Sequence, residues 1–368
     1  MFKTCRMVAQ DASVEHTDHP SAEDSEDVES TTSIANHFPI GDIQLIDEIR
    51  SGLMHSTFRV VAESGTYTLQ RLHKKLATAE IIGDYEAVTH YLYENEVEAP
   101  RLVRTRQNRP VYIDPEHRWW RLATWVEGEA HDKVTSIDQA EEGARALGRF
   151  HRVMSDFTHP FASQHPLHDT TGHLSNLRAA SENPDYAEAR RSVDSEIEQI
   201  LKILPTLLLP DTLPQRVVHG DPKISNVLFD GTRAVGMIDL DTCNRHTLLV
   251  DIGDAIRSWC RDGHEDDKQH FQLDRFEAMM RGYAAEGPTL RVDEIEHLPA
   301  AGRLITMELS SRFARDVMED EYFAFDSERY TTRRAHNIAR TRAMLFLADD
   351  MKAHEKDMRA LVTKYMGR

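Results

Sequence analysis

Two short segments near the middle of the chain place polar residues at fixed spacing between apolar runs. The first carries Asp221, Lys223 and Asn226, and Asp239 follows the next apolar run. In phosphoryl transfer, a carboxylate accepts the proton of the attacking hydroxyl, and oxygen ligands hold Mg²⁺ against the nucleotide phosphates. These needs are met by an Asp, by an Asn five positions later and by a second Asp beyond a hairpin. The pattern therefore predicts two adjacent strand–loop units whose carboxylates face one cleft.

Each residue of this pattern has a role that its chemistry suggests. Asp221 is predicted to be the base that orients the acceptor hydroxyl, and Lys223 to reach the γ-phosphate as a point charge. Asn226 and Asp239 offer the oxygen atoms that Mg²⁺ prefers. Asp241 shares the strand face of Asp239, so it is either a second metal or substrate group or a solvated loop carboxylate. The alternative for the whole pattern, incidental polar residues in a strand–turn–strand unit, fits the spacing poorly.

Three further residues near this pattern are predicted to support it. His219 would orient the backbone of the loop, and Gly220 would allow an unusual dihedral angle there. Asp251 begins a helix-like run, so it either caps that helix or accepts hydrogen bonds from the loop.

The composition excludes several partners. A net charge of −18 on 368 residues disfavours binding to nucleic acid and to anionic lipid. No run approaches the roughly 18 apolar residues that span a bilayer, and the three cysteines form no paired framework, which fits a reducing compartment. A cytoplasmic protein with no nucleic-acid or membrane partner is expected, and the oligomeric state stays open.

The chain divides into three parts. Residues 1–36 hold eight acidic residues against Lys3 and Arg6, with few large apolar residues, and are predicted to be a disordered acidic tail. Residues 37–126 form a small N-terminal lobe, and residues 127–368 form a larger C-terminal lobe.

Local patterns predict the elements of both lobes. The N-lobe is predicted to be a small antiparallel sheet with one helix: strands at 53–61, 66–72, 102–104 and 119–126, a turn at Ser64-Gly65, and a helix at 78–94. The C-lobe is predicted to be mainly helical, with a capping box at Ser136 and Gln139 and short strands at 217–218, 227–229 and 235–238. The fold class is α+β with two lobes.

With these residues in view, the chain resembles the aminoglycoside-phosphotransferase-like branch of the kinase superfamily. The resemblance implies a protein-kinase-like fold that uses ATP and Mg²⁺. Residues 53–58 resemble the nucleotide-binding loop, where Ser56 and Thr57 would contact phosphate. Arg71 takes the place of the phosphate-contacting cation, and Glu86 in the following helix would be its ion-pair partner.

Within that family, the chain looks most similar to N-acetylhexosamine 1-kinase-like enzymes. The resemblance implies that His168, Asp169, Arg312 and Tyr322 contact the acceptor. The alternatives are an Asx turn for the first pair and an ion pair of Arg312 with Asp316 on one helix face. The segments that carry the resemblance are Leu69–Arg71, His168–Thr170, Asp239–Thr242, Asp251–Arg257, Arg312–Phe313 and Tyr322–Phe323.

Two departures from the family pattern leave the acceptor class open: His55 stands where the subgroup tends to have Asn, and Gly220 replaces the Asn of its His-Asn-Asp motif. A third departure concerns phosphate binding, since Gly52 is the only glycine of the nucleotide-binding loop. A small molecule with a hydroxyl group is expected as acceptor, with a sugar or N-acetylhexosamine first and an aminoglycoside or an amino alcohol of choline or homoserine type second. A catalytically silent nucleotide-binding regulator is a rival of another class, disfavoured because Asp221 and Asn226 are both present.

Overall fold

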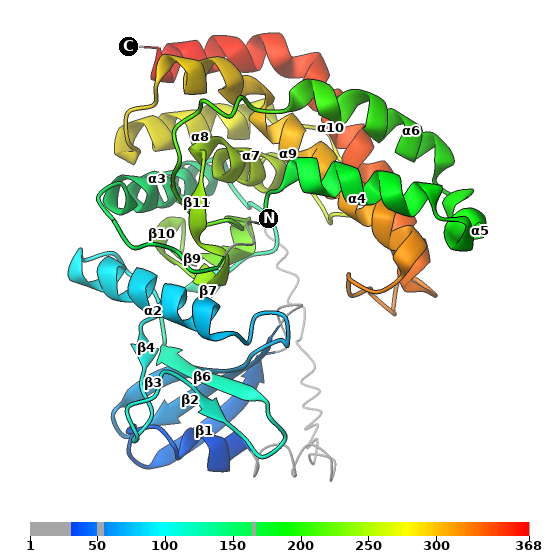
Figure 1. Cartoon of the computed structure of the whole chain (residues 1–368). Helices are drawn as coiled ribbons and strands as arrows, with labels where there is room; N and C mark the ends of the chain where they lie inside the picture. Colours follow the sequence, from blue (N-terminus) through cyan, green and yellow to red (C-terminus); the bar gives the residue numbers. More distant parts are fainter. Residues whose placement is uncertain (1–30, 50–54, 164–166, 368) are drawn as a thin grey trace, which may run out of the picture.

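The computed structural model describes residues 31–49, 55–163 and 167–367. It has the two predicted lobes, with an antiparallel sheet in the smaller lobe and mainly helices in the larger (Figure 1). The predicted two-lobed α+β architecture is confirmed in this arrangement of elements.

The start of the folded region differs from the prediction. Residues 1–30 of the predicted tail, with Gly52, Leu53 and Met54 of the predicted nucleotide-binding loop, lie outside the described residues. Residues 31–35, however, are helical, and the side chains of Ile34 and Ala35 are buried in the N-lobe core. The predicted tail boundary at residue 36 was wrong, because these two apolar residues pack with Phe38 and Ile40 beneath the sheet.

The N-lobe is built on an antiparallel sheet in the order β1-β2-β3-β6-β4, with β5 paired to β6. The predicted turn at Ser64-Gly65 joins β2 to β3, and Ala62 pairs with Gly65 across it. Leu69, Trp120 and Leu122 fill the core on one face of the sheet. The bounds are β1 Ile43–Ile49, β2 Ser56–Ala62, β3 Gly65–Arg71, β4 Leu102–Val103, β5 Tyr112–Ile113 and β6 Trp119–Thr124.

Helix α2, Ala79–Glu94, lies between this sheet and the C-lobe (Figure 1). It begins as predicted after Thr78, whose side chain accepts a hydrogen bond from the main-chain N–H of Ile81 at 3.3 Å. An N-cap of this kind satisfies one of the free N–H groups of the first helical turn. From this helix, the ring of Tyr85 packs against the guanidinium of Arg121 and the carboxylate of Glu86 pairs with Arg104.

The C-lobe packs helices around a short three-stranded sheet, in the order β10-β9-β7, and a two-stranded sheet of β11 and β8. Ser136 caps α3 by accepting a hydrogen bond from the N–H of Gln139 at 3.1 Å, which confirms one half of the predicted capping box. The other half differs, because the side chain of Gln139 accepts from the N–H of Thr135 at 2.7 Å. The strand bounds are β7 Glu129–Ala130, β8 Arg216–Val218, β9 Val227–Asp230, β10 Arg233–Met237 and β11 Asn244–His246. The helix bounds are α3 Ile137–Met154, α4 Thr170–Glu182, α5 Ala187–Arg190, α6 Asp194–Ile203, α7 Leu248–Trp259, α8 Leu273–Glu286, α9 Val292–Glu319 and α10 Arg333–Met366.

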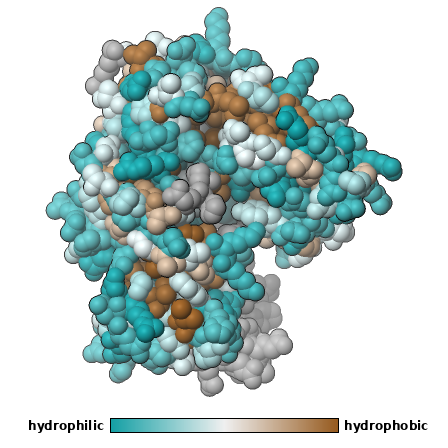
Figure 2. Space-filling view, viewed as in Figure 1, coloured by the Kyte–Doolittle hydropathy of each residue, from teal (hydrophilic) through white to brown (hydrophobic). Residues whose placement is uncertain are grey.

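The outer surface is mainly hydrophilic, and it is hollowed between the N-lobe and the arm that α4, α5 and α6 form (Figures 1 and 2). Within the described part of the chain, no helix combines the length and the apolar character needed to cross a bilayer. The two lobes meet at the catalytic segments that the sequence singles out.

Candidate active site

The loop after β8 carries Asp221, and the side chain of Asp251, on α7, accepts two hydrogen bonds from the backbone of this loop. One carboxylate oxygen of Asp251 accepts from the N–H of His219 at 2.6 Å, and the other accepts from the N–H of Gly220 at 2.9 Å. Burial opposes ionisation of Asp251, but His151 and these hydrogen bonds lower its pKa. Because Thr247 caps α7 instead, the role of Asp251 is to hold the loop, one of the two predicted alternatives.

Gly220 is required by the backbone of this loop. Its φ is +89°, and a Cβ at this position would lie 2.5 Å from the carbonyl oxygen of Thr242. Only glycine combines that dihedral angle with such a close approach. His219 also links this loop to the segment before Asp239, since its Nε2 donates to the carbonyl of Ile238 at 3.0 Å. The loop is therefore fixed against the segment that carries Asp239.

Asp221, Lys223 and Asn226 converge within this loop, as their spacing predicts. The ammonium of Lys223 lies 2.7 Å from Oδ2 of Asp221. The amide of Asn226 donates through its NH₂ group to the main-chain carbonyl of Asp221 at 2.8 Å, a bond that does not use its own carbonyl oxygen. Burial opposes ionisation of Asp221, but Lys223 outweighs it and lowers the pKa of the carboxyl. Asp221 is therefore ionised at neutral pH.

Asp239 follows β10 in a left-handed backbone conformation, with φ 64° and ψ 53°. A residue other than glycine adopts this conformation at a cost, and such strain gathers at functional sites. Burial raises the pKa of Asp239, the charge of Lys223 opposes that shift, and the carboxylates of Asp241 and Asp221 add to it. A bound cation would relieve this repulsion between carboxylates.

The residues present fit a divalent cation. Ligand atoms of His55, Asp239 and Asp241 all lie within 4.8 Å of one another. Of these, the carboxylate oxygens of Asp239 are a hard-cation ligand, and the carbonyl of Asn226 offers a neutral one from the neighbouring loop. Asn226 and Asp239 would hold a divalent cation here, and their binding of Mg²⁺ stays a prediction.

Asp241 forms an ion pair with Arg121 of β6. Nη1 of Arg121 lies 2.5 Å from Oδ1 of Asp241 and Nη2 lies 2.8 Å from Oδ2, and both side chains are 2% exposed. Burial opposes both charges, but their pairing lowers the pKa of Asp241. The predicted solvated carboxylate was wrong, because Arg121 engages both oxygens of this buried group, while a metal or substrate contact by Asp241 stays a prediction. The sequence analysis missed Arg121 because its partner is 120 positions away.

The predicted ion pair of Arg71 with Glu86 was also wrong. Arg71 donates to the hydroxyl of Ser56 at 2.7 Å, while Glu86 pairs with Arg104 at 2.7 Å. Strand alternation is the reason, since neighbouring side chains on β3 point to opposite faces. Gln70, next to Arg71, faces Arg121 and accepts from it at 2.7 Å.

Residues 55–58 of the predicted nucleotide-binding loop are described. Ser56 and Thr57 begin β2, and they pair with Arg71 and Gln70 of β3 respectively. The hydroxyl of Ser56 is engaged by Arg71. Phosphate contacts by Ser56, Thr57 and Arg71 stay predictions.

On the acceptor side, His168 and Asp169 have different surroundings. His168 is buried, and its Nδ1 lies 2.8 Å from Oε1 of Glu308, whose Oε2 accepts from the hydroxyl of Thr170. Burial alone would lower the pKa of His168, but the Glu308 carboxylate raises it. Asp169 is exposed and caps α4 by accepting from the N–H of Gly172 at 2.9 Å. Asp169 is thus a helix N-cap and not the Asx turn given as the alternative, and its contact with the acceptor stays a prediction.

Arg312 and Tyr322 lie together in the C-lobe. The guanidinium of Arg312 stands 5.8 Å from the ring centre of Tyr322, and Nζ of Lys75 stands 4.6 Å from the same ring. The alternative ion pair of Arg312 with Asp316 is wrong, because the Asp316 carboxylate instead accepts from the N–H groups of residues 321–323. Acceptor contacts by Arg312 and Tyr322 stay predictions.

The sequence profile of the phosphotransferase enzyme (APH) family matches residues 46–285, more than half of the chain. The chain belongs to this family. The match covers the catalytic loop and the Asp239 segment, so the predicted phosphotransferase is confirmed. The narrower resemblance to N-acetylhexosamine 1-kinase-like enzymes stays a prediction.

Relatives of this phosphotransferase carry kinase names. A homoserine kinase of Bradyrhizobium sp. (strain ORS 278) is 26% identical over 268 residues, covering 72% of this chain and 78% of that protein. Among solved structures, amicoumacin kinase hAmiN in complex with AMP-PNP, Ca²⁺ and Ami has a TM-score of 0.61 at 16% identity, covering 92% and 93% of the two chains. A microcompartment-associated aminopropanol kinase has a TM-score of 0.61 at 17% identity, covering 89% and 98%. The two structural likenesses support the fold.

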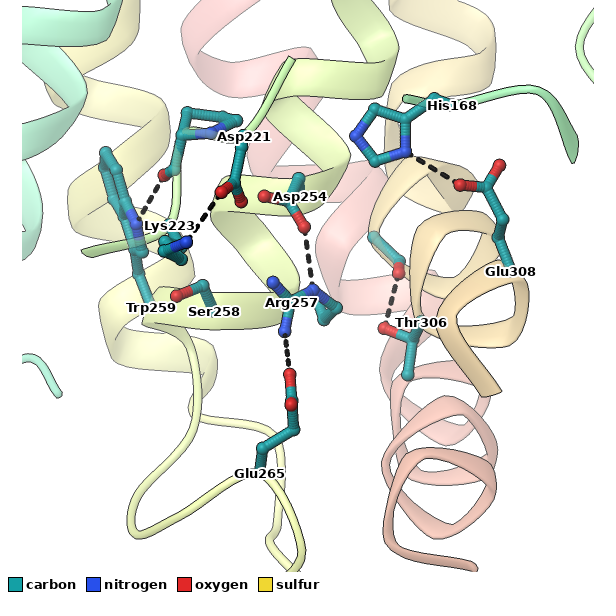
Figure 3. A network of polar contacts seen from close by, with 12 residues as sticks. His168, Asp221, Lys223, Asp254, Arg257, Ser258, Trp259, Glu265, Thr306 and Glu308 are labelled. Carbon is teal, nitrogen blue, oxygen red and sulfur yellow. Dashed lines mark hydrogen bonds and ion pairs between the residues drawn. The ribbon is translucent and has the colours of Figure 1, made fainter. Parts of the chain in front are cut away.

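Sequence reasoning on this phosphotransferase missed a polar network below Asp221 (Figure 3). Asp254 of α7 bonds through Oδ1 to Nε of Arg257 at 2.8 Å, and Arg257 also contacts Glu265 at 3.0 Å. Ser258 accepts from the N–H of Ile224 at 3.1 Å. The sequence did carry a signal for this network, because α7 places polar residues among apolar ones. Every residue of α7 is buried, so these polar side chains need partners inside the protein.

Proposed function

We propose that this phosphotransferase is an ATP- and Mg²⁺-dependent kinase that transfers the γ-phosphoryl group to a hydroxyl of a small polar molecule. The observation that carries the proposal is the convergence of Asp221, Lys223 and Asn226 in one loop that Asp251 holds rigid. Phosphoryl transfer depends mainly on positioning and on charge neutralisation, and this loop supplies both.

The charge of each residue suits it to a different role in the transfer. Asp221 is ionised and partly exposed, so it orients the acceptor hydroxyl and accepts its proton as the new O–P bond forms. Lys223 neutralises charge on the transferred group. Asn226 and Asp239 hold Mg²⁺, which neutralises charge on the phosphates when bound.

The acceptor class has two candidates. The names homoserine kinase and aminopropanol kinase among the relatives support an amino-alcohol-type acceptor. The sugar or N-acetylhexosamine predicted first from the sequence is supported by ion pairs on the acceptor side, where Glu308 is matched by His168 and Asp254 by Arg257. A site with matched charges does not attract a cationic acceptor strongly.

A screen of acceptors tests the proposal. ADP release is measured with ATP and Mg²⁺ for hexoses, N-acetylhexosamines, homoserine, amino alcohols and aminoglycosides, with Asp221→Asn as the inactive control. At least one acceptor should raise turnover above the acceptor-free rate, and the variant should not respond. Tight binding of ATP and Mg²⁺ without turnover for any acceptor would instead identify a silent nucleotide-binding protein.

A further inference from the structure

Two buried side chains on the acceptor side each keep one polar atom without a partner. The side chain of Asp254 bonds to Arg257 through Oδ1, while Oδ2 contacts no hydrogen-bond partner among the residues described. The ring of His168 bonds to Glu308 through Nδ1, and its Nε2 is unpartnered within the same ranges of the chain. Asp254 is 4% exposed and His168 is 6% exposed. Such atoms are costly to leave unpaired, so each points to a group that binds there.

Both atoms face the space beside the proposed base. In Figure 3 the unpaired oxygen of Asp254 points toward the carboxylate of Asp221, and the free ring nitrogen of His168 points to the same side. The Asp254 carboxylate contributes to raising the pKa of both His168 and Lys223, so it lies within electrostatic reach of each. A molecule held by Asp254 and His168 would thus lie beside Asp221.

We propose that Oδ2 of Asp254 and Nε2 of His168 bind two hydroxyl groups of a neutral polyhydroxy acceptor and so present a further hydroxyl to Asp221. This inference rests on the proposed kinase function and names the class of its acceptor. A hydroxyl group suits both atoms, because it donates to a carboxylate and also either donates to or accepts from an imidazole nitrogen.

The charges beside these atoms favour hydroxyl groups over an ammonium group. Arg257 already matches the charge of Asp254, and His168 matches that of Glu308. Arg312 lies one helical turn beyond Glu308 on α9 and helps to lower the pKa of His173, after burial, so it adds positive charge on this side. An ammonium group would find unpaired hydrogen-bond acceptors here but little net negative charge.

Two conservative variants remove one atom each and keep the structural bonds. Asp254→Asn retains an oxygen for Arg257 and replaces Oδ2 by an NH₂ group. His168→Asn retains an N–H donor for Glu308 and deletes Nε2. Asp357→Asn and His90→Asn, at exposed positions on α10 and α2, are matched controls.

Binding is measured by calorimetry in the presence of AMP-PNP and Mg²⁺, so that the result does not depend on turnover. The probes are neutral hexoses and N-acetylhexosamines, their cationic 2-amino counterparts, homoserine and ethanolamine. Wild type should bind a neutral sugar, and each variant should bind it about 10- to 100-fold more weakly. The affinity for AMP-PNP should be unchanged, which shows that each variant is folded at the temperature of the assay, even where the weakened buried ion pair lowers the Tm. The two controls should match wild type.

A deoxy analogue adds a double-mutant cycle. Removing the sugar hydroxyl that meets Asp254 should weaken binding, and Asp254→Asn should weaken binding of that analogue little further, because the contact is already lost. Wild-type affinity in both variants, or binding of ammonium compounds in preference to every neutral sugar, would overturn the inference. Binding of a neutral sugar that is never phosphorylated would instead overturn the proposed function and leave this subsite standing.

Discussion

Arg121 of the N-lobe and Asp241 of the C-lobe form a two-bond ion pair, and water reaches only 2% of either side chain. The pair joins the sheet to the segment that carries Asp239. Removing one member of a buried pair leaves an unpaired charge, which is more costly than replacing both.

Arg121→Leu should therefore destabilise the protein strongly. The expected loss is about 3–5 kcal/mol, measured as the free energy of unfolding in urea. The double variant Arg121→Leu/Asp241→Leu should recover much of this loss, because no charge is left without a partner. Equal stability of the single and double variants would show that the Asp241 charge is satisfied by other groups.

Asp221→Asn should separate catalysis from nucleotide binding. Loss of a positioned base costs about 10²–10⁴-fold in turnover, whereas affinity for AMP-PNP should stay near that of wild type. Steady-state kinetics and calorimetry together check this expectation. A variant that retains more than half of the wild-type kcat would refute the assignment of Asp221.

Asp239→Ala should weaken nucleotide binding as well as turnover. Its carboxylate is the proposed anionic ligand of Mg²⁺, while Asn226 provides only a neutral oxygen. Calorimetry with AMP-PNP at several Mg²⁺ concentrations should show that the metal-dependent gain in affinity is lost. If that gain persists in the variant, Asp239 does not hold the metal.

The N-terminal boundary can be tested by two truncations. Deletion of residues 1–30 should leave the Tm unchanged, as the acidic composition of that segment predicts. Deletion of residues 1–36 should lower the Tm, because it removes Ile34 and Ala35 from the N-lobe core. Ile34→Ala isolates this effect, with an expected loss of about 2–5 kcal/mol. Equal Tm values for the two truncations would contradict the packing of this segment.

Stability should fall at acidic pH through Asp251. Its pKa is lowered in the folded protein, so its contribution is fully present above the unfolded value of about 3.9 and is lost as the pH falls toward the folded pKa. The side chain faces His151 and the N–H groups of His219 and Gly220. In urea titrations, the free energy of unfolding of Asp251→Asn should depend less on pH below about 4 than that of wild type. If the variant and wild type showed the same pH dependence, Asp251 would not be a source of the loss of stability at acidic pH.

Within a few residues, sequence spacing and local chemistry predicted the structure well. The +2 and +5 spacing after Asp221 predicted a loop in which Lys223 and Asn226 turn back to it. The N-cap at Ser136 also appears where the sequence places it, and α2 begins next to the predicted start at residue 78. Such features depend on backbone geometry and short-range hydrogen bonds, which neighbouring residues largely determine.

Contacts between distant segments were decided by packing. Arg71 does not pair with Glu86, because the pleat of β3 and the rotation of α2 direct the two side chains to different neighbours. The sequence also did not predict Arg121 as the partner of Asp241. His168 meets Glu308 across 140 positions of sequence. The sequence by itself determined the family, the catalytic loop and the lobes, since these follow from local patterns. Only the tertiary structure decided which buried charges pair and which atoms of Asp254 and His168 stay free, because that choice depends on how helices and sheet pack against one another.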